Sequence, residues 1–365
     1  MAKKNKGIIT DATMEFIERY LNNASPTGFE ASGQKIWLEY IQPYIDTHFV
    51  DNYGTAVGVI NPDAPFKVVI EAHADEIGWF VKYITADGFI HVCRNGGSDH
   101  QIAPSKRVNI HTKKGIVKGV FGWPAIHTRM RGGEKEKQPT VETIWVDVGA
   151  KDKKEVEKLG IHVGCVCTFN EGFEVLNYDF WIGRAMDNRM GGVIIAEVAR
   201  LLKENKEKLP FGLYIVNAVQ EEVGLNGATM IARRIKPDVA IVTDVTHDSN
   251  TPMVSKAAEG DVSCGKGPVL TYAPAVHNIL LDIIINTADK NEIPYQLEAA
   301  YRSTGTDTDA FAYANDGTPS ALISLPLRYM HTTVETVHKS DVENCIRLMY
   351  ETLLKITPKT NFKYL

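Results

Sequence analysis

The chain shows two kinds of hydrophobic pattern. From residue 1 to about 76, and again from about 176 to the end, segments with apolar residues at helical spacing alternate with short, continuous apolar runs. Between about 77 and 175 the apolar runs are shorter, and turns such as Ala86-Asp-Gly88 and Lys113-Lys-Gly115 separate them. The first pattern is typical of α/β proteins, and the second is typical of a small barrel or sandwich.

These patterns predict particular elements. In the outer segments we expect helices over 10–22, 30–40, 188–204, 225–234, 276–290, 308–315 and 340–356, and strands over 68–72, 212–219, 239–243, 294–299 and 319–324, with a hairpin around Asp51–Gly54. In the middle segment we expect strands over 79–84, 89–93, 108–112, 116–121, 143–148 and 165–169, and one short helix near 151–159.

The simplest architecture for this order is one domain interrupted by another. Residues 1–76 and 176–365 would together form an α/β domain, a doubly wound mixed sheet with helices on both faces. Residues 77–175 would form an inserted, small all-β domain resembling a barrel. A chain of 365 residues is long enough for one large core and a second, smaller one.

Composition narrows the class of protein. The net charge of −5 argues against a dedicated nucleic-acid binder, which normally has a basic face. No apolar run approaches the roughly 18 residues that span a bilayer, and the basic start is followed by a segment too short and polar for a signal peptide. The five cysteines, an odd number at irregular spacing, do not form a disulfide framework. We therefore expect a cytoplasmic protein without nucleic-acid or membrane partners.

Ionisable residues follow the apolar strands of the outer segments. His73 follows the strand at 68–72, Glu221 and Glu222 follow 212–219, Asp244 follows 239–243, and His331 follows the strand near 319–324. In open α/β sheets, ligands bind outside the carboxyl ends of the strands, so these side chains are expected at one edge. A further acid, Asp187, stands where a loop enters the helix at 188–204.

Each of these residues alone has an ordinary interpretation. A single histidine at a strand end is usually structural, Asp187 could be a helix N-cap, and Asp244 could cap the polar turn that follows it. Together, however, two histidines and three carboxylates form a nitrogen and oxygen ligand set that suits Zn²⁺ and, nearly as well, Co²⁺ or Mn²⁺. Their joint occurrence favours a site for two divalent ions, which need carboxylates for neutralisation and one bridging group.

Five short motifs give this site a family resemblance. They are His73-x-Asp75, Ala185-Met-Asp187-Asn-Arg189, Val219-Gln-Glu-Glu-Val-Gly224, Thr243-Asp244 and Arg328-Tyr-Met-His331. In this order, over nearly the whole chain, they resemble the metallopeptidase family M42, the tetrahedral or glutamyl-type aminopeptidases among the dinuclear-zinc exopeptidases. The resemblance implies the metal ligands His73, Asp187, Glu222, Asp244 and His331. It also implies that Asp187 bridges the two ions, that Glu221 is the catalytic base and that Asp75 orients His73.

Two features remain open at this stage. The Gly305–Asp309 segment resembles a substrate-side loop of the family, but a helix start capped by Asp307 or Thr308 explains it equally well. His127, in the inserted segment, could approach the site or be an ordinary surface histidine.

The expected activity is removal of N-terminal amino acids from peptides, because a carboxylate-rich site can receive a free α-amino group. Arg184 and Arg328 leave a carboxypeptidase as a minor alternative, since such an enzyme needs a cationic clamp. Another metal-dependent amide hydrolase on the same scaffold, such as a deacylase, is the main alternative, and a binding protein with a vestigial site is a third. The resemblance further implies a homo-oligomer, a dodecamer built through the insert.

Overall fold

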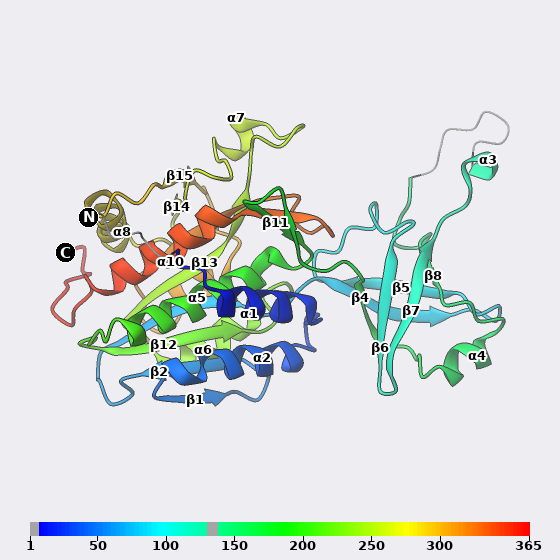
Figure 1. Ribbon diagram of the computed structural model, residues 1–365, viewed down its shortest axis with the longest axis horizontal. Coiled ribbons are helices and arrows are strands. Elements are labelled where there is room, and N and C mark those ends of the chain that lie inside the picture. The colour runs from blue at the N-terminus through cyan, green and yellow to red at the C-terminus, as the bar shows by residue number, and fades with distance from the viewer. Residues whose placement is uncertain (1–6, 130–137) are drawn as a thin grey trace.

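A computed structural model describes residues 7–129 and 138–365 of the chain. It contains a large mixed sheet flanked by helices and, beside it, a closed barrel (Figure 1). The barrel stands at one end of the α/β part, and the C-terminus lies at the other end (Figure 1). None of the described helices is long and apolar enough to cross a membrane.

Within the described residues the large sheet has eleven strands. They are β1 (Thr47–Val50), β2 (Ala56–Ile60), β3 (Lys67–His73), β10 (Glu174–Leu176), β11 (Phe180–Gly183), β12 (Gly212–Ala218), β13 (Val239–His247), β14 (Val269–Tyr272), β15 (Gln296–Ala299), β16 (Ser320–Arg328) and β17 (Glu335–His338). The helices around it are α1 (Asp11–Asn22), α2 (Ala31–Ile41), the 3₁₀ turn η1 (Gln42–Tyr44), α5 (Met186–Glu204), α6 (Asn226–Ile235), α7 (Lys256–Glu259), α8 (Asn278–Lys290), α9 (Asp307–Ala312) and α10 (Lys339–Leu353).

The strand order is β1-β2-β12-β3-β13-β16-β17-β11-β10, with β14 paired to β16 and β15 paired to β14. The four central strands β12, β3, β13 and β16 are parallel, and antiparallel strands extend the sheet on both sides. This arrangement confirms the predicted mixed α/β sheet. It is also the arrangement in which the carboxyl ends of several buried strands share one edge.

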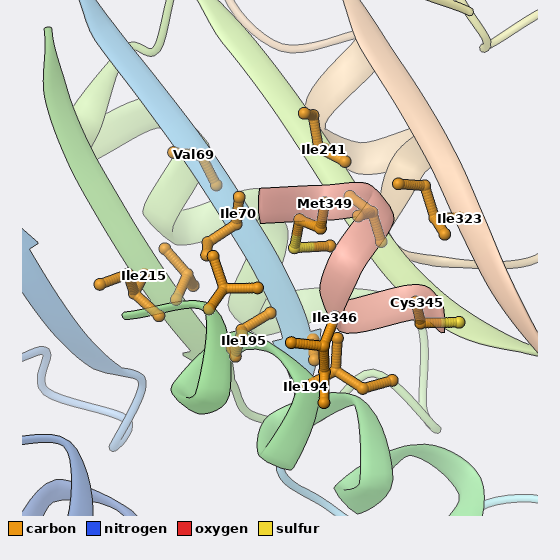
Figure 2. Close-up of a cluster of buried hydrophobic side chains, with 14 of the residues drawn as sticks. Val69, Ile70, Ile194, Ile195, Ile215, Ile241, Ile323, Cys345, Ile346 and Met349 are labelled. Carbon is orange, nitrogen blue, oxygen red and sulfur yellow. The ribbon is translucent and has the colours of Figure 1, made fainter. Parts of the chain in front are cut away.

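The main core lies between this sheet and two helices. Ile194 and Ile195 of α5 pack with Ile346 and Met349 of α10 over apolar side chains of the central strands, including Ile70 (Figure 2). Because alternate side chains of a strand point to opposite faces, Glu71 and His73 point away from this core. Helices α6 and α9 contact the sheet on that other face, beside β12, β13 and β16.

The barrel contains six antiparallel strands in the closed order β4-β5-β8-β7-β6-β9. They are β4 (Gly78–Ile84), β5 (Ile90–Asn95), β6 (Arg107–Thr112), β7 (Gly115–Gly122), β8 (Trp145–Asp147) and β9 (Val166–Phe169), accompanied by the short helices α3 (Ile126–Arg129) and α4 (Lys153–Lys158). Trp79, Phe121 and Phe169 fill its interior together with aliphatic side chains. The predicted barrel is thus confirmed, and Trp79 and Phe121 belong to its own core.

The structure differs from the predicted elements in several places. The strands β10, β11, β14 and β17 and the short helices α3 and α7 were not predicted, because segments of three or four residues are too short to show a period. Strand β13 extends to His247 rather than ending before Asp244, because it pairs with β16 as far as Leu327. β10 pairs within the large sheet and spans the predicted boundary at residue 175, so the exact division into two domains stays a prediction.

Candidate metal centre

The predicted ligand residues meet where two central strands separate. Strand β3 pairs with β12 as far as His73, but its pairing with β13 ends at Glu71 and Val242. Beyond this point β3 and β13 diverge, and His73 and Asp244 lie on opposite sides of the opening. The opening is at the carboxyl end of the parallel strands, the position in which α/β proteins bind ligands.

The other candidate residues come from loops with unusual backbone conformations. Ala185, Gln220 and His331 have φ values of 61°, 58° and 60°, in the left-handed region that non-glycine residues rarely adopt. Each such residue costs on the order of 1 kcal/mol, so the surrounding structure must enforce it. These turns direct the side chains of Asp187, Glu221 and His331 back towards the end of β3. Nothing in the local sequence indicates the turns, because none of them contains glycine at the left-handed position.

Asp187 lies between the two histidines. Its Oδ1 is 3.2 Å from Nε2 of His73, and its Oδ2 is 3.3 Å from Nε2 of His331. Potential ligand atoms form two overlapping groups, each within 4.8 Å: His73, Asp187 and Asp244 in one, and Asp187, Glu222 and His331 in the other. Asp187 is common to both groups. It does not cap the helix, since Oδ1 of Asn188 accepts the hydrogen bond from the N–H of Gly191 at 3.1 Å.

Two buried carboxylates hold the backbone around these residues. Nδ1 of His73 is hydrogen-bonded to the backbone carbonyl oxygen of Asp75 at 3.2 Å and lies 3.4 Å from the Asp75 carboxylate. This carboxylate accepts the backbone N–H groups of Glu221 and Glu222 at 3.0 and 3.2 Å. Glu335 accepts the N–H of Asp187 at 3.1 Å and that of His331 at 2.8 Å. Asp75 was expected beside His73, but Glu335 was not foreseen. The only signal for Glu335 in the sequence is an acid in a short strand just after His331.

The electrostatics of the site favour positive charge. Burial alone would favour neutral imidazoles, yet hydrogen bonds to Asp187 and Glu222 raise the pKa of His331 to about 11. The pKa of His73 also lies well above its usual value, because Asp187 and Asp75 outweigh the effect of burial. Burial raises the pKa of Asp244 to about 7, with further contributions from neighbouring carboxylates. Such a concentration of acids around two imidazoles fits a divalent cation, which the same oxygen and nitrogen atoms would ligate.

Glu221 lies next to these residues but outside both groups of ligand atoms. Its Oε2 is 3.8 Å from Nε2 of His73. Burial raises the pKa of Glu221 to about 10, and the nearby carboxylates Asp244 and Asp307 add to this shift. A divalent charge in the pocket would act in the opposite direction and favour the ionised carboxylate. Glu221 therefore differs in position from its neighbour Glu222, which belongs to one of the two groups of ligand atoms.

A second pair of acids lies beneath the site and was not foreseen. Glu71 of β3 and Asp307 at the start of α9 are both buried, and their carboxyl oxygens have no hydrogen-bond partner among the described residues. Burial raises the pKa of Glu71 to about 8 and that of Asp307 well above its usual value. Their mutual interaction fits one proton shared between them. Glu71 was hidden in the sequence because it stands inside an apolar strand.

The site opens into a cavity of about 610 Å³. Besides the candidate ligands and Glu221, the residues that line it are Leu225, Val245, Thr246, His247, Ser303, Thr304, Gly305, Thr306, Asp309 and Met330. The Gly305–Asp309 segment therefore borders the pocket, and the residue that caps α9 is Thr306, not Asp307 or Thr308. His127 is exposed on α3 and does not line the cavity.

The two arginines considered for a carboxylate clamp are engaged elsewhere. Arg184 pairs with buried Glu76, and Arg328 pairs with Asp248 at 2.6 Å. Neither arginine lines the cavity. A free α-carboxylate would thus find no lysine or arginine among the described lining residues, which disfavours the carboxypeptidase alternative.

Known aminopeptidases are similar to this protein over nearly the whole length of the chain. The TET aminopeptidase of a marine sediment archaeon of the Thaumarchaeota is 30% identical, with a TM-score of 0.91 over 96% of this chain and 98% of that one. The TET1 peptidase of Pyrococcus horikoshii, which can assemble into a tetrahedron or a large octahedral shell, is 26% identical, with a TM-score of 0.82 over 93% and 98%. The lysyl aminopeptidase of Pyrococcus furiosus is 31% identical over 345 residues, 94% of this chain and 97% of that protein. Fold and site together define an aminopeptidase.

The family is equally clear. The sequence model of the M42 glutamyl aminopeptidases matches residues 54–348, and the chain belongs to this family. The resemblance carried by the five motifs is thereby confirmed. The roles of the individual residues stay predictions.

Proposed function

We propose that this protein is a two-metal aminopeptidase that releases N-terminal amino acids from peptides. In this proposal His73, Asp187, Glu222, Asp244 and His331 hold two divalent ions, with Zn²⁺ the best match to the ligand set and Co²⁺ or Mn²⁺ as alternatives. The position of Asp187 is the observation that carries the proposal. Its two carboxylate oxygens face different histidines at 3.2 and 3.3 Å, as expected of a residue that bridges two ions.

The other residues of the site have roles that follow from their positions. Bound divalent ions would polarise the scissile carbonyl group and make a nearby water more acidic. Glu221, beside the ligands but outside both groups, would take the proton from that water and deliver it to the leaving amine. The surplus of carboxylates would receive the free α-ammonium group of the peptide, and the cavity of about 610 Å³ would accept its first side chain.

Removal and return of metal test the proposal directly. Chelator-treated protein should lose aminopeptidase activity and regain it with Zn²⁺ or Co²⁺ at about two ions per chain, measured by mass spectrometry of the metals and by release of nitroaniline from aminoacyl-nitroanilides. Full activity of rigorously metal-free protein would contradict it. An N-acetylated peptide is the matched control substrate. Cleavage of this blocked peptide at the same rate as the free one would favour a deacylase or another amide hydrolase.

We further propose that the chain assembles into a homo-oligomer, most simply a dodecamer. The Pyrococcus horikoshii TET1 peptidase can assemble into a tetrahedron or a large octahedral shell, and this chain aligns with nearly all of it. On this chain, Val175 and Leu176 of the edge strand β10 and the adjacent Tyr178 are exposed. Light scattering should give a mass of many subunits. A stable, active monomer of about 40.5 kDa would show that these surfaces serve another purpose.

A further inference from the structure

A loop of the barrel reaches into the metal centre. Residues Gly96 and Gly97 follow directly after β5 and lie against two of the candidate ligands. A Cβ atom at Gly96 would be 3.1 Å from Cβ of Glu222 and 3.4 Å from its Oε2. A Cβ atom at Gly97 would be 2.5 Å from Cε1 of His331 and closer still to Nδ1. The backbone of the barrel loop is therefore in contact with the Glu222 and His331 side chains, and no larger residue fits at position 97 without moving the imidazole.

This loop is fixed in its position by buried polar contacts. The side-chain amide of Asn95 donates to the carbonyl oxygen of Thr27 at 2.8 Å, and the hydroxyl of Ser98 donates to the carbonyl oxygen of Gly78. Both side chains are buried. A third contact joins the barrel to the loop that carries His331, because Lys106 donates to the hydroxyl of Thr333 at 2.7 Å. These contacts hold the barrel loop in a fixed position against the side chains of Glu222 and His331.

The side chain of His331 is less constrained by its other neighbours than the side chain of His73 is. The His73 side chain is only 2% exposed, and Asp75 lies beside its Nδ1, whereas the His331 side chain is 34% exposed. Among the described residues, 7–129 and 138–365, no group forms a hydrogen bond with Nδ1 of His331. Gly97 lies next to this atom instead. Histidine ligands are normally oriented by an acceptor on the nitrogen that does not bind the metal. For His331, packing against the glycine backbone takes this place.

We propose that Gly97 is a positioning residue that directs His331 towards Asp187 and Glu222. The inference rests on the proposed two-metal function, because it concerns one of the two ligand groups. The group formed by Asp187, Glu222 and His331 would depend on the barrel. The group formed by His73, Asp187 and Asp244 would not, since its residues come from the large sheet and from α5. The barrel would then contribute to the active site of its own chain without providing a ligand.

The substitution Gly97→Ala tests this dependence. The backbone of Gly97 is not left-handed, so alanine meets no backbone strain there, and the atoms nearest to its methyl group all belong to His331. We expect the variant to retain one tightly bound ion and to bind the second at least about tenfold more weakly, the usual scale for disturbing the support of a metal ligand. Titration with Co²⁺, followed by visible absorption and by metal content after dialysis, measures both ions. The melting temperature of the metal-free protein should stay unchanged.

Gly115→Ala is the matched control in the same barrel. Gly115 has a φ of 117° and no atom within 4 Å of an added Cβ, so this variant strains the barrel backbone without touching the metal centre. It should bind two ions with wild-type affinities. Equal loss of the second ion in both variants would mean that general destabilisation of the barrel is responsible, and the proposal would be wrong.

The remaining outcomes separate this inference from the proposed function. If wild-type protein binds two ions and Gly97→Ala binds both with unchanged affinity, the positioning role is refuted while the two-metal function stands. If wild-type protein binds no divalent ions, the proposed function itself fails. If Gly97→Ala does not fold, Ser98→Ala decides, because it removes the hydroxyl that holds the loop through the carbonyl oxygens of Gly78 and Asn95. Weaker binding of the second ion then supports the proposal, and unchanged binding overturns it.

Discussion

Oδ1 of Asp75 accepts the backbone N–H of Glu221 at 3.0 Å. Through its other oxygen, the same carboxylate accepts the N–H of Glu222 at 3.2 Å and the hydroxyl of Thr27 at 2.8 Å. Asp75 therefore connects the end of β3, which carries His73, to the turn that carries the proposed base. It supports both residues at once, because the left-handed Gln220 directs the two following N–H groups towards it.

This relationship predicts a combined defect for Asp75→Asn. An amide can accept through only one of its two groups, so one of the backbone N–H contacts is lost and Glu221 shifts together with His73. We expect about a 10- to 100-fold loss in metal affinity, the scale for residues that orient a ligand, together with a lower kcat. Metal titration and steady-state kinetics at saturating metal separate the two effects. A variant with lower metal affinity but normal kcat when fully loaded would show that Asp75 acts on His73 alone.

Glu221→Gln should separate catalysis from metal binding. Glutamine retains the shape of the side chain but cannot accept the proton, and loss of a positioned general base typically lowers kcat by at least about 100-fold. Metal content and melting temperature should stay at wild-type values, since Glu221 belongs to neither group of ligand atoms. Asp187→Ala is the contrasting variant, and it should lose both ions. Near-normal turnover of Glu221→Gln would mean that another group is the base.

Glu30 predicts a pH-dependent contribution to stability. Its side chain is buried close to Asp75, and burial together with that charge raises the pKa of Glu30 to about 7. The folded protein thus holds this proton more tightly than the unfolded chain does. The stabilisation that results from this proton is fully present below the ordinary pKa near 4.5 and is lost as the pH rises to about 7. The loss lowers the free energy of unfolding by about 3 kcal/mol.

The variant Glu30→Gln should remove this dependence and stabilise the protein at pH 8 relative to wild type. Urea unfolding at several pH values and constant protein concentration measures the difference. The exposed glutamate Glu18 provides the control, since Glu18→Gln should leave the pH profile unchanged. If the difference between Glu30→Gln and wild type is the same at pH 4 and pH 8, Glu30 is not the responsible group.

The lining of the cavity predicts which N-terminal residues are cleaved well. No lysine or arginine is present among the described lining residues, and Asp309 adds a carboxylate beyond those of the metal centre. An acidic first side chain would therefore remain unpaired in a partly enclosed pocket. We expect kcat/KM for glutamyl-nitroanilide to be at least about tenfold below those for the leucyl and lysyl compounds, a difference of about 1.4 kcal/mol. Asp309→Asn should narrow the gap between lysyl and glutamyl substrates, and a clear preference for the glutamyl compound would contradict this prediction.

The hydrophobic pattern by itself determined much of this protein. Continuous apolar runs such as Val239–Val242 predicted the central strands, and the short, turn-separated runs predicted the barrel. Both follow from local physics, because periodicity and turn residues decide which segments become helices or strands. The acids and histidines at the strand ends were predicted to come together because parallel strands place their carboxyl ends at one edge of the sheet.

Only the tertiary structure decided how that edge becomes a site. The separation of β3 from β13, the left-handed turns at Ala185, Gln220 and His331, and the support from Glu335 all depend on contacts between segments far apart in the chain. The contact of Gly97 with His331 joins residues of two different cores. No local propensity predicts such contacts, because strained turns and close backbone approaches persist only when the packing of the whole fold compensates for them.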